Sequence, residues 1–158
     1  MHPYTLFQVG TGLGTPSTAR KEEKTRTKAS FGHQQNDHFI VRNGERYAGA
    51  HLIIDLYEAE RLSDIDHIDK TLRACVEAAG ATLLHIHLHH FEPNNGVSGV
   101  AVLAESHISI HSWPEHRYAA LDVFMCGDAD PAACVPLLRE AFKVKRIVVR
   151  EHLRGREL

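Results

Sequence analysis

One short segment of the chain combines a carboxylate, hydroxyls and two imidazoles, in the run Glu105-Ser106-His107-Ile108-Ser109-Ile110-His111. Cys126 follows fifteen residues after His111 and precedes a glycine. A hydroxyl or thiol beside imidazoles can act as a nucleophile, because a histidine can accept the proton that the nucleophile loses. The pattern alone is a weak indication, since serines lie next to histidines in many proteins. An ordinary structural role for Ser106 therefore stays open at this point.

Two apolar, strand-like stretches flank this segment. Residues 97–104 precede it and residues 108–113 follow it, so that only Glu105-Ser106-His107 separates them. In a regular strand, side chains five positions apart point to opposite faces of the sheet. Ser106 and His111 can therefore meet only if the chain breaks or bulges between them.

Local periodicity predicts the elements that must position these residues. Helices are expected over 63–80, with Ser63 as N-cap and Gly80 as the stop, and over 130–143, with Asp130 as N-cap. Strands are expected over residues 50–57, 82–91, 97–104, 108–113, 118–125 and 146–151. Short connections between the strands favour an α+β fold. We predict a two-layer α/β sandwich with a mainly antiparallel sheet and both helices on one face.

The strand over residues 82–91 alternates strictly between apolar side chains and histidines. Leu84, Ile86 and Leu88 form one face, and His85, His87 and His89 form the other. Three imidazoles on one face raise the alternative of a protein that binds zinc or nickel. Same-face side chains stand almost 7 Å apart along a strand, which is too wide for three of them to share one ion without a bulge or another segment. A polar sheet face or a subunit contact is the simpler interpretation.

Composition limits the class of protein. The 158 residues suit one compact domain, which we place at residues 47–158, after an N-terminal extension over residues 1–46 that is polar and that we expect to be mobile. The net charge of -2 leaves no basic excess for nucleic acid. The chain has neither an apolar run of about 20 residues nor a secretory signal, so we expect a cytoplasmic protein with no membrane span. Its three cysteines lack paired spacing, which argues against a disulfide framework.

The longest motif resembles a known family. The stretch GVSGVAVLAESHISIHSWPE at residues 96–115, continued by YAALDVFMCG at residues 118–127, is similar to the signature of the small prokaryotic S-adenosylmethionine decarboxylases. Looser similarity extends over residues 47–155. The resemblance implies a proenzyme that cuts itself between Glu105 and Ser106 into an N-terminal β chain and a C-terminal α chain. Ser106 would become a covalent pyruvoyl group that forms a Schiff base with S-adenosylmethionine and releases CO2, without a metal.

The resemblance also implies roles for particular residues. His111 would accept a proton during processing, with Ser98 as its hydrogen-bonding partner, and Cys126 would return a proton to the substrate carbon. Phe91, Glu115 and Trp113 would bind the substrate, the first by stacking on adenine and the second through the ribose hydroxyls. The family further implies a homodimer that stacks two sheets into a four-layer α/β/β/α arrangement, and a place in spermidine and polyamine biosynthesis.

Two departures from the family pattern leave the substrate open. The turn at residues 92–96 is one residue longer than expected, and His116-Arg117 stands where the family pattern has an aromatic residue followed by glycine. Both lie near the expected substrate pocket. The alternatives are a pyruvoyl-dependent arginine or ornithine decarboxylase on the same scaffold and, in another class, the metal-binding protein or a non-catalytic subunit.

Overall fold

The computed structural model describes residues 38–156, which form one layer of strands and one layer of helices. The strands are β1 (Ile40–Arg42), β2 (Glu45–Tyr57), β3 (Leu83–Phe91), β4 (Gly96–Leu103), β5 (Ser106–Trp113), β6 (Tyr118–Met125) and β7 (Arg146–Arg156). The helices are α1 (Ile65–Ala78) and α2 (Cys134–Ala141), with short 3-10 turns at Pro114–His116 and Pro131–Ala133.

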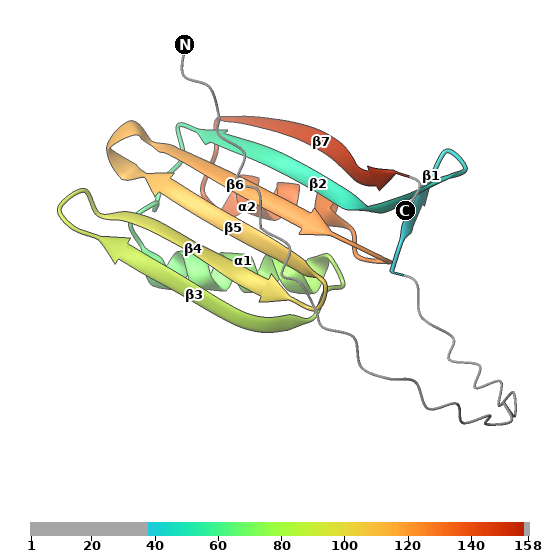
Figure 1. Ribbon diagram of the computed structural model, residues 1–158. Coiled ribbons are helices and arrows are strands. Elements are labelled where there is room, and N and C mark those ends of the chain that lie inside the picture. The colour runs from blue at the N-terminus through green and yellow to red at the C-terminus, as the bar shows by residue number, and fades with distance from the viewer. Residues whose placement is uncertain (1–37, 157–158) are drawn as a thin grey trace, which may run out of the picture. The chain divides into compact units, whose positions relative to one another are not determined.

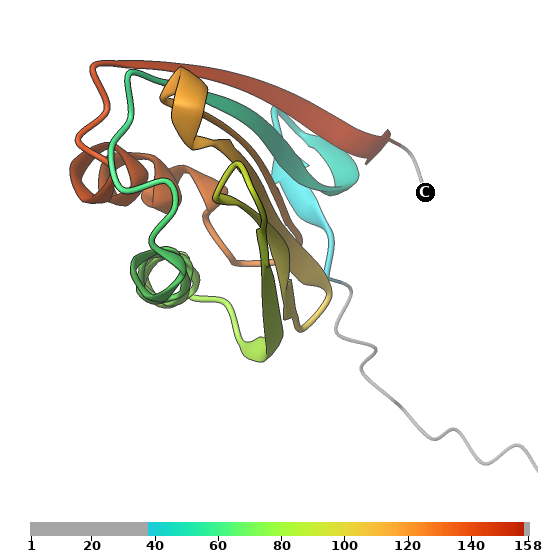
Figure 2. The same ribbon diagram turned by 90° about the vertical axis from the view of Figure 1, so that its left-hand side faces the viewer.

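All seven strands join one antiparallel sheet, in the order β1-β2-β6-β5-β4-β3, while β7 pairs with β2 (Figure 1). Both helices cover the same face of this sheet (Figure 2). The predicted α+β sandwich is therefore confirmed. We call the face turned away from the helices the open face. Within residues 38–156, neither helix is long or apolar enough to cross a lipid bilayer.

The core lies between the sheet and the two helices. Alternate residues of β2, β5 and β6 point into it, and α1 contributes side chains spaced by three or four positions. Its members include Leu52, Ile54, Leu56, Ile68, Leu72, Val76, Ile108, Ile110, Leu121 and Val123, all less than 5% exposed. Because these apolar side chains point toward the helices, the alternate side chains of each strand point to the open face. The burial pattern therefore determines which polar side chains are available for chemistry.

The sheet begins earlier in the chain than the sequence predicted. Residues 40–46, assigned above to the N-terminal extension, form β1 and the start of β2, and residues 1–37 lie outside the described residues. Asn43 and Gly44 make the connection with φ angles of 54° and 81°. Two positive φ values in a two-residue turn give the twist that a β-hairpin requires, and Asn-Gly adopts them with little strain.

The observed helix termini lie within a few residues of the predicted ones, and each difference has a local cause. Asp64, and not Ser63, caps α1 by accepting a hydrogen bond from the His67 amide at 3.0 Å. Asp130 caps the second helical segment as predicted, but that segment begins as a 3-10 turn and continues as α2 only from Cys134. Pro136 then falls in the first turn of α2, where a missing backbone N–H leaves no hydrogen bond unmade.

The alternation predicted for β3 is wrong at the start of the strand. The register with β4 shifts between Leu83 and His85, and Leu84 is 64% exposed, whereas Ile86 and Leu88 pack against the core. A bulge at this point moves one residue out of phase with the rest of the strand. The histidines at 85, 87 and 89 are exposed, and no group of three His, Cys, Asp or Glu side chains placed to hold a metal occurs in the described part of the chain.

Candidate active site

A tight turn connects β4 to β5 at the predicted cleavage position. Leu103 pairs with Ser106 across the two strands, so only Ala104 and Glu105 lie between them. Glu105 has a φ of 62°, a conformation that costs a non-glycine residue about 1–3 kcal/mol. The interruption predicted over Glu105-Ser106-His107 is thus a two-residue turn, and β5 starts directly at Ser106. The peptide bond between Glu105 and Ser106 therefore joins the strained turn residue to the first residue of β5.

Cys126 contacts both sides of that peptide bond. Its backbone N–H donates to Ser106 Oγ at 3.3 Å, and its Sγ donates to the carbonyl oxygen of Glu105 at 3.2 Å. The contact arises because β6 runs antiparallel to β5, with Phe124 opposite His107, so that the residue after β6 reaches the start of β5. We call Glu105, Ser106 and Cys126 the Ser106 cluster. It holds a hydroxyl beside a carbonyl that already receives a hydrogen bond.

The environment of Cys126 favours the protonated thiol. Burial raises the pKa of Cys126 above its usual value, the negative charge of Glu105 raises it further, and a hydrogen bond with Ser106 opposes both effects. A thiol with a raised pKa stays protonated at neutral pH. The residue is therefore suited to give a proton to a substrate, and less suited to act as a thiolate nucleophile.

The other predicted site residues gather at the opposite end of the sheet. Ser98 Oγ lies 2.8 Å from His111 Nδ1 across β4 and β5, and the ring of Trp113 stacks beside His111 with 6.2 Å between centroids. A hollow of about 310 Å³ there is lined by Phe91, Ser98, Trp113 and Glu115, among others. We call Phe91, Ser98, His111, Trp113 and Glu115 the His111 cluster. It places two aromatic rings and a carboxylate on the wall of one hollow, with the His111 imidazole beside Trp113 and Ser98.

The two clusters do not meet within one chain. Ser106 and His111 stand five positions apart on β5, which corresponds to about 17 Å along a strand. Ser106 is 9% exposed and faces the helices, whereas His111 is exposed on the open face. The predicted opposition of these side chains is thus confirmed in the uncut chain. Of the eight predicted site residues, three form one cluster and five form the other.

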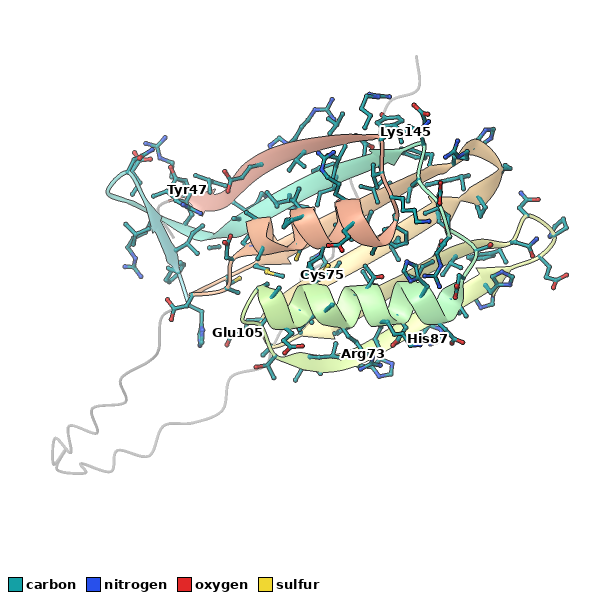
Figure 3. The ribbon with its side chains drawn as sticks, turned by 180° about the vertical axis from the view of Figure 1, so that it is seen from behind. Tyr47, Arg73, Cys75, His87, Glu105 and Lys145 are labelled. Atoms are coloured by element: carbon teal, nitrogen blue, oxygen red, sulfur yellow. The ribbon has the colours of Figure 1, made fainter. Side chains whose placement is uncertain are left out.

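Two groups of polar residues beside these clusters were not predicted. On the open face, Ser109 Oγ donates to Asp122 at 3.1 Å, and His51 Nε2 lies 3.4 Å from the same carboxylate. The alternation of β2, β5 and β6 would have placed these three side chains on one face. His38 Nδ1 lies 2.8 Å from Glu105 Oε2 at the end of the sheet where Glu105 is seen in Figure 3. No local pattern marks His38, because the contact joins segments far apart in sequence.

The remaining cysteines have structural surroundings. Cys75 and Cys134 are both fully buried between α1 and α2, and both are free. Each sulfur lies near the other residue's carbonyl oxygen, at 3.9 Å from Cys75 and 3.6 Å from Cys134. They behave as small core residues, which agrees with the absence of paired cysteine spacing in the sequence.

Comparison with known proteins places this arrangement in a family. The family model described as S-adenosylmethionine decarboxylase matches residues 50–155. The S-adenosylmethionine decarboxylase proenzyme of Thermomicrobium roseum is 44% identical over 108 residues, which cover 68% of this chain and 93% of that protein. The proenzyme of the same description from Methanococcus maripaludis is 47% identical over 110 residues, covering 68% and 89%.

A solved structure supports the same assignment. The crystal structure of the adenosylmethionine decarboxylase from Aquifex aeolicus aligns with a TM-score of 0.60 and 35% sequence identity, covering 69% of this chain and 92% of that one. The matched region contains β3 to β6, which carry both clusters. On sequence and fold together, the chain belongs to the S-adenosylmethionine decarboxylase family.

Proposed function

We propose that this protein is a self-processing decarboxylase that converts Ser106 into a pyruvoyl group and removes the carboxylate of S-adenosylmethionine as CO2. The observation that carries the proposal is the double contact of Cys126 with Ser106 Oγ and with the Glu105 carbonyl, at a turn whose φ is strained. The nucleophile, the carbonyl and the proton donor lie within hydrogen-bond reach of one another, which is the geometry that an intramolecular acyl transfer needs.

The cleavage follows from the chemistry of these groups. Ser106 Oγ attacks the carbonyl carbon of Glu105, the C–N bond breaks, and the hydroxyl proton passes to the freed nitrogen, which leaves an ester. A base then removes the α-proton of residue 106, and the Glu105 carboxylate leaves. The resulting dehydroalanine takes up water and loses ammonia to form the pyruvoyl group. The N-terminal β chain ends at Glu105, and the α chain begins with the modified residue.

In the mature protein, the pyruvoyl carbonyl supplies an electron sink for the bond that loses CO2. The chain itself then has two tasks. The thiol of Cys126 delivers a proton, because its raised pKa keeps it protonated at neutral pH. The aromatic rings of Phe91 and Trp113, which are 48% and 40% exposed, offer flat surfaces for an adenine ring, and Glu115 offers a carboxylate for ribose hydroxyls.

The separation of the two clusters supports a homodimer. Two sheets that pack face to face around a twofold axis that lies between them, parallel to the sheets and perpendicular to the strands, bring opposite ends of the two open faces together. Each complete site would then combine the Ser106 cluster of one protomer with the His111 cluster of its partner. The Ser98–His111 pair would act as the base that removes the α-proton of the partner's residue 106, which it cannot reach in its own chain.

Arg117, at one of the departures from the family pattern, does not line the hollow. Arg117 has a φ of 51°, a conformation that glycine adopts without strain, which explains why glycine is expected at this position. Its guanidinium donates to the Glu58 carbonyl at 3.3 Å and lies 4.0 Å from Glu60. The positive charge of Arg117 is thus paired with the segment between β2 and α1. An aromatic hollow of this kind fits an adenosyl group better than free arginine or ornithine. We infer that the reaction belongs to polyamine biosynthesis in the cytoplasm.

The proposal is tested by the intact mass of the purified protein under denaturing, reducing conditions. Wild-type protein should give two chains that meet between Glu105 and Ser106, and the α chain should show the mass deficit of pyruvoyl relative to serine. Ser106→Ala should remain a single chain of 17.7 kDa and release no CO2 from S-adenosylmethionine. A folded wild-type protein that stays uncut would refute the proposal, and a panel with arginine and ornithine would identify a different substrate.

The dimeric site is tested by mixing two inactive chains. His111→Ala should not cut itself when expressed alone, because its partner's Ser106 faces no base. Co-expressed with Ser106→Ala, the His111→Ala chain should be cut, since it meets the intact His111 of the other chain. If cleavage never appears in the mixture although mixed dimers form, the two clusters do not act across an interface.

A further inference from the structure

One residue outside the family match contacts both sides of the Ser106 cluster. His38 precedes residue 50, where the match to the family model begins. Its Nδ1 lies 2.8 Å from Glu105 Oε2, and its carbonyl oxygen accepts a hydrogen bond from the Gly127 amide at 2.8 Å. His38 therefore joins the residue before the cleaved bond to the residue after Cys126.

The β1–β2 hairpin delivers His38 to this place. Ile40 pairs with Tyr47, so the chain before β1 runs back along β2 toward the end of the sheet that carries Glu105. In Figure 3, Tyr47 and Glu105 lie at the same end of the molecule. Gly127 has a φ of 60°, which favours glycine, and its amide donates to the His38 carbonyl. The backbone of His38 is thus held in place by the hairpin and by this hydrogen bond, and not by one flexible side chain alone.

We propose that His38 is a positioning residue for self-cleavage. This inference rests on the proposed function and adds to it a residue that the family match does not contain. Cys126 holds the Glu105 carbonyl and the Ser106 hydroxyl, and His38 holds the Glu105 side chain, so the acyl group is fixed from both ends. Fixing the acyl group near the attacking oxygen raises the fraction of chains in a reactive geometry.

The same contact contributes little to the stability of the fold. Both side chains are 52% exposed, and exposed ion pairs stabilise proteins only weakly. Loss of His38 should therefore slow the cleavage without unfolding the domain. This difference separates positioning from a merely structural role.

The experiment follows cleavage of newly made chains in a cell-free translation reaction. His38→Ala should slow the appearance of the two fragments by roughly two- to fivefold, the range expected for an exposed pair. His38→Asn should recover most of the rate, because its amide nitrogen takes the place of Nδ1. Val41→Ala, at a 65% exposed position of β1, serves as the matched control and should cleave like wild type.

The Glu105→Ala background tests whether His38 acts through Glu105. There, His38→Ala should cause no further loss of rate, because the partner that it positions is gone. If wild type does not cleave at all, the proposed function itself fails. If wild type cleaves and His38→Ala matches its rate, only the positioning role is overturned. A His38→Asn variant as slow as His38→Ala, with both lowering the melting temperature, would also overturn it in favour of a structural role.

Discussion

Replacement of Cys126 by alanine should separate cleavage from turnover. Cleavage should survive, because the backbone N–H that donates to Ser106 Oγ remains and only the contact from Sγ to the Glu105 carbonyl is lost. A sulfur hydrogen bond at 3.2 Å is worth at most about 1 kcal/mol, which corresponds to a cleavage rate lowered by no more than about fivefold. Turnover should fall by roughly 10²- to 10⁴-fold, the usual contribution of a positioned proton donor.

The assay measures both quantities on one sample. Mass spectrometry over time gives the cleavage rate, and CO2 release per fully cut chain gives turnover. Cys75→Ala is the control: Cys75 is fully buried under α2, so its loss should lower stability and leave turnover per folded, cut chain unchanged. Turnover of Cys126→Ala within tenfold of wild type would refute the role of the thiol. A complete failure to cleave would show that the hydrogen bond from Cys126 Sγ to the Glu105 carbonyl contributes more to the cleavage rate than the fivefold allowed above.

Three further results are expected. The charge of Glu105 raises the pKa of Cys126, so in Glu105→Gln the alkaline fall in turnover, which reflects loss of the thiol proton, should move to lower pH; a shift to higher pH would contradict this. Ser112→Ala should destabilise the fold by about 1–3 kcal/mol in urea unfolding, since the buried Val97 N–H loses its acceptor at 2.8 Å; an unchanged midpoint would contradict this. A carboxylate hydrogen bond raises the pKa of Tyr118 to about 12, so its stabilisation should hold below pH 10 and be lost as pH rises toward 12; Tyr118→Phe should remove one tyrosine that ionises near pH 12 in an absorbance titration.

The elements that the sequence predicted correctly are those whose signal is local. α1 shows its apolar stripe and its terminal glycine within one window of sequence, and β6 alternates without interruption. One error arises where a neighbouring strand decides the outcome. Leu84 leaves the alternation because β3 shifts its register against β4, which no property of β3 alone reveals. β1 was missed although its signal was local, because the polar composition around Asn43-Gly44 outweighed a hairpin dipeptide.

The site was less predictable than the fold, for a related reason. The contact of Cys126 with Glu105 and Ser106 depends on the register of β5 with β6, and spacing along the chain alone left Ser106 with an open role. The resemblance to the family identified the candidate site residues, and the structure shows that they form two separate clusters. His38 carried neither a motif nor a family match, so only its tertiary contact identifies it.

The division of the site into two clusters bears on when the chain can cut itself. In a single protomer the nucleophile faces the helices, while the Ser98–His111 pair faces the opposite side about 17 Å away. A newly folded protomer therefore holds a strained turn, a nucleophile and a polarised carbonyl, while its own Ser98–His111 pair lies too far away to complete the elimination. In the proposed dimer that base arrives with the second copy, so the irreversible step waits for assembly. Such an order would protect the chain, because a cut made before the sheets are packed would release β5 from the β4 connection that holds its start in register.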